Sequence, residues 1–85
     1  MVSNTETLVR NVLDEVFALG GRAMSLRPDA SLHAMLPELD SMAATAVITL
    51  IEERLAVTVE PSDITGSDFE SLAALIAAVN RLRGT

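Results

Sequence analysis

The chain has 85 residues and a net charge of −6, and it contains no cysteine. This length is enough for one domain with one core, so we expect a single domain spanning residues 1–85. The lack of cysteine excludes disulfides, thiolate metal ligands and cysteine nucleophiles. The negative charge disfavours nucleic-acid binding and would attract basic patches on other proteins, although acidity can also serve solubility alone.

Apolar residues make up 49% of the chain, which has two phenylalanines and neither tryptophan nor tyrosine. The core is therefore expected to be aliphatic, which suits packed helices and lets side chains shift to admit a flexible guest. No apolar stretch approaches the roughly 20 residues of a membrane span, and no secretory signal is evident. We expect a cytoplasmic monomer with no membrane insertion.

The first helix is predicted from a capping box at Ser3 to Glu6, in which each side chain satisfies a backbone N–H. The pair Gly20-Gly21 is expected to end the helix, because glycine readily adopts the left-handed conformation. Apolar residues recur between these limits at helical spacing, namely Leu8, Val9, Val12, Leu13, Val16 and Phe17.

Residues 21–39 lose this periodicity, and Pro28 and Pro37 interrupt any long helix. The segment is nevertheless rich in apolar side chains, which a loose linker would not be. We therefore predict a long loop anchored on the bundle, with one helical turn near Ser31 to Met35.

The second helix is predicted to begin at Asp40-Ser41 and to end near Leu55, and residues 57–59 are expected to form an extended connector. Glu52, Glu53 and Arg54 mark its solvent side. Its apolar positions are Met42, Val47, Ile48, Leu50, Ile51 and Leu55.

A short third helix is predicted from Pro61 to Thr65, ended by Gly66, and a second capping box from Ser67 to Glu70 opens the last helix. The pattern therefore predicts an all-α fold, a small four-helix bundle of three main helices and one short helix with a long first loop. The last helix has apolar residues at helical spacing, namely Phe69, Leu72, Leu75, Ile76, Val79 and Leu82.

The tetrapeptide Leu39-Asp40-Ser41-Met42 lies where the irregular loop meets a long amphipathic helix. A helix N-terminus favours a phosphate through its free N–H groups and its partial positive charge. A serine there would hold its hydroxyl in solvent on a rigid support, which suits a phosphodiester-linked prosthetic group. Taken alone, however, the tetrapeptide is better explained as an ordinary N-cap.

The wider pattern changes this balance, because Asp40-Ser41-Met42 resembles the Asp-Ser-Leu/Met signature of the acyl carrier protein family. Most of the chain matches the family's order of elements, and residues 39–82 match best. The resemblance implies that a separate phosphopantetheinyl transferase esterifies Ser41 with 4'-phosphopantetheine taken from coenzyme A. The arm's thiol would then carry an acyl or polyketide intermediate as a thioester, so the protein is expected to be a carrier and not an enzyme.

The resemblance also implies surfaces and an interior for this cargo. Acyl-loading and acyl-transferring enzymes would recognise the helix after Ser41, with Asp40, Met42, Glu52 and Glu53 as the contact candidates. The inward-facing Val47 and Ile51, together with Ile64 on the short helix, are the candidates for lining an acyl pocket. Ordinary core packing is at least as good an explanation for each of these three singly.

The sequence departs from the family pattern in two places. Ala43, Ala44 and Ala46 occupy the first turns after Ser41, where fatty-acid carriers often have acidic residues, and Glu38-Leu39 stands where many carriers have glycine. The alanines favour close apolar contact with partners over electrostatic docking. They point to specialised lipid or polyketide biosynthesis, with fatty-acid synthesis left in doubt.

A metal site and a hydrolase active site have less support in the sequence. His33 is the only histidine, so a metal site is not expected, and a triad of Ser41, His33 and Asp40 lacks the Gly-x-Ser-x-Gly elbow of hydrolases. Two alternatives to an acyl carrier remain: an aminoacyl or peptidyl carrier, and a helical adaptor with the carrier fold that is never modified.

Overall fold

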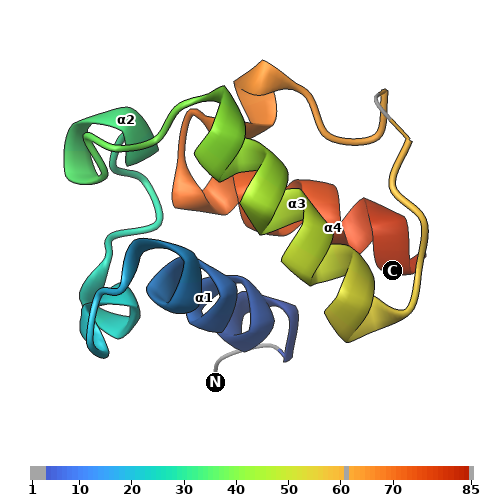
Figure 1. Ribbon diagram of the computed structural model, residues 1–85, viewed down its shortest axis with the longest axis horizontal. Coiled ribbons are helices and arrows are strands. Elements are labelled where there is room, and N and C mark those ends of the chain that lie inside the picture. Colours follow the sequence, from blue (N-terminus) through green and yellow to red (C-terminus); the bar gives the residue numbers. More distant parts are fainter. Residues whose placement is uncertain (1–3, 61, 85) are drawn as a thin grey trace.

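The computed structural model describes residues 4–60 and 62–84, and these form a helical bundle. Three long helices are connected by short helical turns (Figure 1). The long helices are α1 (Asn4–Phe17), α3 (Ser41–Leu55) and α4 (Leu72–Arg83), and the short elements are α2 (Leu32–Met35) and the 3₁₀ turns η1 (Arg22–Ser25) and η2 (Gly66–Phe69). The predicted all-α class, with three main helices and a long first loop, is confirmed.

The helices enclose an aliphatic core between α1, α3 and α4, and α1 packs against both of the others. Among the described residues, no helix combines the length and the apolar character that crossing a membrane requires. The fully buried large side chains are Val9, Val12, Leu13, Leu32, Val47, Ile51, Leu72, Leu75 and Val79.

Helix α1 ends earlier than the sequence predicted. Its last residue is Phe17, and Ala18 takes the left-handed conformation (φ 52°) that was expected of the glycine pair. The Leu19 N–H then donates to the Asp14 carbonyl (3.0 Å), as in a Schellman closure. The glycines instead form the turn into η1, while the Ser3 half of the predicted capping box lies outside the described residues.

The loop from residue 18 to residue 40 is anchored, as predicted. The Arg10 guanidinium, whose side chain is only 8% exposed, donates to the carbonyls of Ala23 (2.8 Å) and Leu26 (2.9 Å) and to the Glu6 carboxylate (3.0 Å). A second side chain of α1 joins it, since the Asp14 carboxylate accepts the N–H groups of Gly21 (2.8 Å) and Ala23 (3.2 Å), and together they hold the first half of the loop against the bundle.

The second half of the loop is fastened to the start of α4. The Leu32 N–H donates to the Glu70 carbonyl (3.2 Å), and the Ala73 N–H donates to the Pro28 carbonyl (2.9 Å). These bonds lie beside an isolated antiparallel bridge between Ser31 and Ser71. Helices α2 and α4 therefore begin next to each other, and the predicted helical turn at 31–35 is confirmed as α2.

The predicted position of the third short helix is wrong. No helix covers the described residues between 61 and 65, and the 3₁₀ turn η2 begins at Gly66, the residue expected to end a helix. The capping box that forms is Thr65 with Asp68, two residues earlier than the predicted Ser67 with Glu70. Phe69 therefore belongs to η2, and α4 begins only at Leu72.

Replacing Arg10 with methionine tests the anchoring of the loop. We expect Arg10→Met to lower the free energy of unfolding by about 2–3 kcal/mol, because two carbonyls that are largely shielded from water lose a charged donor. Chemical denaturation followed by circular dichroism measures this change.

The matched control is Arg27→Met. The Arg27 side chain is 77% exposed and pairs with an equally exposed Asp29 at 3.4 Å, so its loss should cost less than about 0.5 kcal/mol. Equal costs for the two variants would show that Arg10 does not anchor the loop.

Candidate functional site

Ser41 is the first residue of α3, and the residue before it caps the helix. Asp40 has an extended backbone (φ −133°, ψ −173°), and its carboxylate accepts the Ala43 N–H at 2.8 Å. The Ser41 side chain is exposed, and within the described part of the chain its hydroxyl has no hydrogen-bond partner. A polar group at a rigid helix start is therefore left available for chemistry.

A cleft of about 290 Å³ opens beside Ser41. Its walls come from α2, from the start of α3 and from η2, and its lining is mainly apolar. At Gly66 an added Cβ would meet no atom within 4 Å, so that part of the wall faces open space. The lining residues are His33, Leu39, Asp40, Ser41, Ala44, Gly66 and Phe69.

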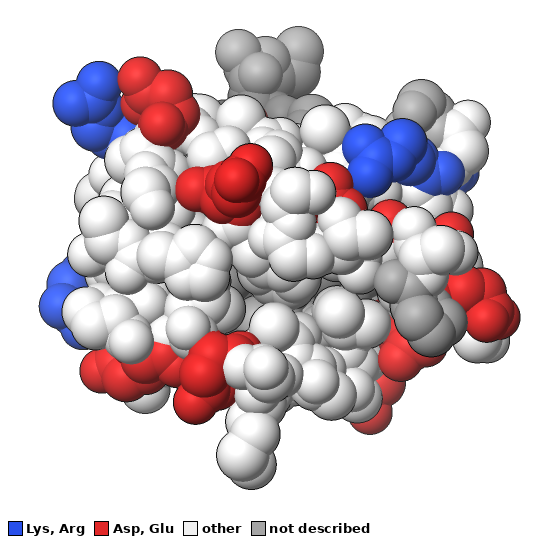
Figure 2. All heavy atoms as spheres, turned by 90° about the horizontal axis from the view of Figure 1, so that it is seen from above, with Lys and Arg blue, Asp and Glu red and all other residues white. Residues whose placement is uncertain are grey.

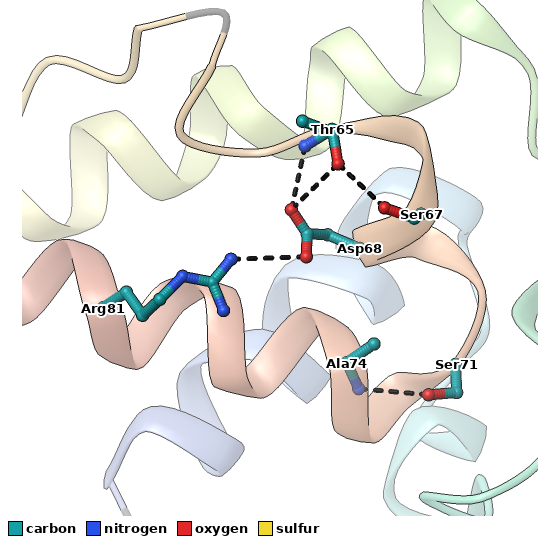
Figure 3. A network of polar contacts seen from close by, with 6 residues as sticks. All are labelled: Thr65, Ser67, Asp68, Ser71, Ala74 and Arg81. Carbon is teal, nitrogen blue, oxygen red and sulfur yellow. Dashed lines mark hydrogen bonds and ion pairs between the residues drawn. The ribbon is translucent and has the colours of Figure 1, made fainter.

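The wall formed by η2 is held by the Asp68 carboxylate (Figure 3). Asp68 accepts the Thr65 N–H at 2.9 Å and an Arg81 N–H from α4 at 3.3 Å. The Thr65 N–H lowers the pKa of Asp68 most, burial opposes this shift, and Arg81 adds to the lowering. The same figure shows Ser71 capping α4 through the Ala74 N–H (3.0 Å).

The proposed acyl-pocket residues lie in the core and do not line the cleft. Val47 and Ile51 are fully buried and Ile64 is 5% exposed. All three belong to the same core cluster as Phe69. Ile64 lies in the bend before η2, not on a helix as predicted. The inward orientation predicted for Val47 and Ile51 is confirmed, whereas a role of the three residues in holding cargo stays a prediction.

The contact candidates of α3 differ in how available they are. Met42 is 83% exposed and Glu53 is exposed. Glu52 is half-buried, and its carboxylate accepts the Val59 N–H at 2.8 Å, so it also fastens the connector after α3. Asp40 is exposed while serving as the cap. Within residues 4–60 and 62–84, the Met42 and Glu53 side chains make no such internal bond.

Charged groups are sparse in the middle of the face that is seen from the side of α2 and η2. Figure 2 shows this middle region as largely uncharged, with acidic and basic side chains mainly toward its edges. Ala46 and Thr45 at the start of α3 are exposed, and neither carries charge. The small uncharged surface that the sequence predicted at the start of α3 is therefore present.

His33 lies exposed on α2 and lines the cleft together with Ser41. In the part of the chain that the structure describes, no group of three potential ligands gathers to hold a metal ion. The Asp40 carboxylate, which a triad would need to orient the histidine, is bonded to the helix backbone instead. His33, Gly66 and Phe69 were not expected beside Ser41, because no local pattern links them to it, whereas Leu39 and Ala44 were noted as its neighbours in sequence and not as lining of a cleft.

These features define a small helical bundle with an exposed serine at the start of a helix and a cleft beside it. Residues 8–79 match the family described as the phosphopantetheine attachment site. The chain therefore belongs to the phosphopantetheine-binding carrier protein family.

A solved structure agrees with this assignment. The solution structure of a holo acyl carrier protein from Nitrosomonas europaea is 36% identical in sequence, with a TM-score of 0.83. The alignment covers 99% of this chain and 100% of that one. No match was found among curated proteins. The fold is thus that of acyl carrier proteins, and a phosphopantetheine prosthetic group follows from the family.

The lowered pKa of Asp68 predicts how the stability of the fold depends on pH. Its carboxylate stabilises the fold above its ordinary pKa of about 3.9, and this contribution is lost as the pH falls through the lower pKa of the folded state. Asp68→Asn should therefore be less stable than the parent chain at pH 7, and the difference should shrink as the pH falls below about 4. Urea denaturation of both proteins at several pH values measures it.

Asp29→Asn serves as the control, since the Asp29 side chain is 76% exposed and pairs with the equally exposed Arg27. We expect it to match the parent chain at every pH. A stability deficit of Asp68→Asn that stays constant from pH 7 to pH 2 would contradict the assigned role of the carboxylate.

Proposed function

We propose that this protein is an acyl carrier protein that bears 4'-phosphopantetheine on the Ser41 hydroxyl. The observation that carries the proposal is the exposed hydroxyl at the first position of α3, free of partners in the described chain while Asp40 does the capping. The position also lies inside the matched segment 8–79. A cleft beside it offers room for part of the arm.

In the attachment reaction the chain itself supplies only the attacking oxygen, and the transferase provides the catalysis. In the active site of a transferase, the Ser41 oxygen attacks the pantetheine-side phosphorus of the coenzyme A pyrophosphate and loses its proton. The phosphoanhydride bond breaks, and the nucleotide leaves with the other phosphate. The attached group supplies a thiol that holds cargo as a thioester. The chain contributes a rigid, accessible oxygen and a surface for partner enzymes.

Acyl cargo is favoured over aminoacyl or peptidyl cargo. The similar solved protein is itself an acyl carrier protein, and the core is built of aliphatic side chains that can shift around a flexible guest. In this proposal Val47, Ile51 and Ile64 form the part of the core that yields to the chain. The uncharged start of α3 supports partners in specialised lipid or polyketide synthesis.

Intact-mass analysis tests attachment at Ser41 and distinguishes a carrier from an unmodified adaptor. Incubation with coenzyme A and a broad-range phosphopantetheinyl transferase should add the mass of one phosphopantetheine. Ser41→Ala should abolish the gain while changing the thermal midpoint little, because the side chain is exposed and alanine suits a helix.

Ser67→Ala provides a matched control, since Ser67 is exposed at the start of η2 and should not affect loading. A mass gain that persists in Ser41→Ala would refute the assigned position. No gain in the parent chain would favour the adaptor.

The proposed docking through α3 predicts how partner affinity depends on salt concentration. We propose that the exposed Met42 and the neighbouring alanines contact partners, with Asp40, Glu52 and Glu53 as an acidic margin. Apolar contact is little screened, so the affinity for the transferase should fall less than about threefold between 0.05 and 0.3 M NaCl. Titration calorimetry measures it.

Ala46→Glu is the informative comparison, because residue 46 is exposed and the change adds one charge to the surface that is proposed to dock. This variant should depend more steeply on salt than the parent chain. A tenfold or larger loss for the parent chain over the same range would show that electrostatic docking dominates.

A further inference from the structure

His33 shares the cleft with the proposed attachment site. It belongs to α2, whereas Ser41 begins α3, and both line the same space of about 290 Å³. The remaining lining residues are apolar or glycine, apart from Asp40. Any group attached to the Ser41 oxygen therefore starts beside this space, which His33 also lines.

Besides the backbone N–H groups at the start of α3, a phosphodiester on Ser41 would meet one donor among the described side chains that line the cleft, that of His33. Asp40, the neighbouring residue, is negative, and its carboxylate is engaged by the Ala43 N–H. None of the chain's six arginines lines the cleft. Several of them already have other partners: Arg10 binds the Ala23 carbonyl of the first loop, Arg54 pairs with Glu15, Arg81 pairs with Asp68, and Arg83 donates to Thr5.

An imidazole can meet this need in either protonation state. Neutral histidine offers one N–H donor and protonated histidine offers two, with a positive charge. Among the described side chains that line the cleft, once the Ser41 hydroxyl is esterified, His33 is the one with an N–H to donate. The rest of the lining suits the branched, apolar carbons that follow the phosphate in a phosphopantetheine arm.

We propose that His33 is a positioning residue for the prosthetic arm. Its imidazole donates a hydrogen bond to a phosphodiester oxygen on Ser41, and the geminal methyl groups of the arm pack against Leu39, Ala44 and Phe69. This inference rests on attachment at Ser41. It gives the base of the arm a preferred resting place in the cleft and leaves the thiol end outside.

The tether makes even a weak contact effective. A group linked to Ser41 by a few bonds is held near the cleft at an effective concentration of about millimolar or above. The cleft is at the lower limit of ligand pockets, which begin at about 300 Å³. It therefore suits the first segment of the arm and not the whole arm with its cargo.

The single histidine makes the test direct, because its ring signals in an NMR spectrum need no assignment among several. We compare the unmodified protein, the protein loaded with ¹³C-labelled phosphopantetheine, and loaded His33→Ala. Loading should shift the His33 ring signals and give Overhauser contacts from the ring to the labelled methyl groups. In loaded His33→Ala the ³¹P signal should move, and the docked fraction of the arm should fall about threefold to tenfold.

Two further variants separate positioning from a merely structural effect. His33→Gln keeps an N–H donor and should restore much of the docked fraction. The double variant His33→Ala with Ala34→His moves the imidazole to an exposed neighbouring position that does not line the cleft, and should not restore it.

Unchanged His33 ring signals on loading, or equal docked fractions in the parent chain and His33→Ala, would overturn this inference and leave the carrier function intact. Failure of Ser41 to gain the arm at all would overturn both, and intact mass distinguishes the two cases before any spectrum is recorded.

Discussion

The bond from the Ala43 N–H to the Asp40 carboxylate determines what Ser41 can do. A serine that caps a helix uses its own oxygen on the backbone, as Ser31 does with Ala34 and Ser71 with Ala74. Because Asp40 takes the capping position, the next residue begins the helix with its hydroxyl uncommitted. The difference between a structural serine and an available one is therefore set by its neighbour.

The anchored loop between α1 and α3 also shapes the surroundings of Ser41. Arg10 holds its first half, and backbone bonds to the start of α4 hold its second half. This fixes α2 near the beginning of α3, which is why His33 and Ser41 line one cleft although eight positions separate them in sequence. The irregular segment is thus part of the site's construction as well as a connection between helices.

The sequence predicted the long helices well because each combines periodic apolar residues with an end signal. It misplaced the short third helix, which was predicted from Pro61 and Gly66, and it misplaced the start of the last helix, since two overlapping patterns, Thr65 with Asp68 and Ser67 with Glu70, both fit a capping box. Contact with Arg81 of α4 stabilises the first pattern, and a local pattern contains no such information. The glycine stop failed for a related reason, because Ala18 accepts a left-handed backbone where the chain must turn.

The candidate site also depends on contacts between distant elements, which a local sequence pattern does not contain. Helical periodicity correctly placed Val47 and Ile51 on the inward face, but it indicates direction and not where packing leaves space. That space lies between elements far apart in sequence, on the outer side of Phe69, which belongs both to the core and to the wall of the cleft. Leu39 and Ala44 likewise line the cleft and pack against the core cluster that contains Val47, Ile51 and Ile64. An acyl chain sheltered in that interior has to be accommodated by movement of aliphatic side chains, which a core with so few aromatic rings permits at modest cost.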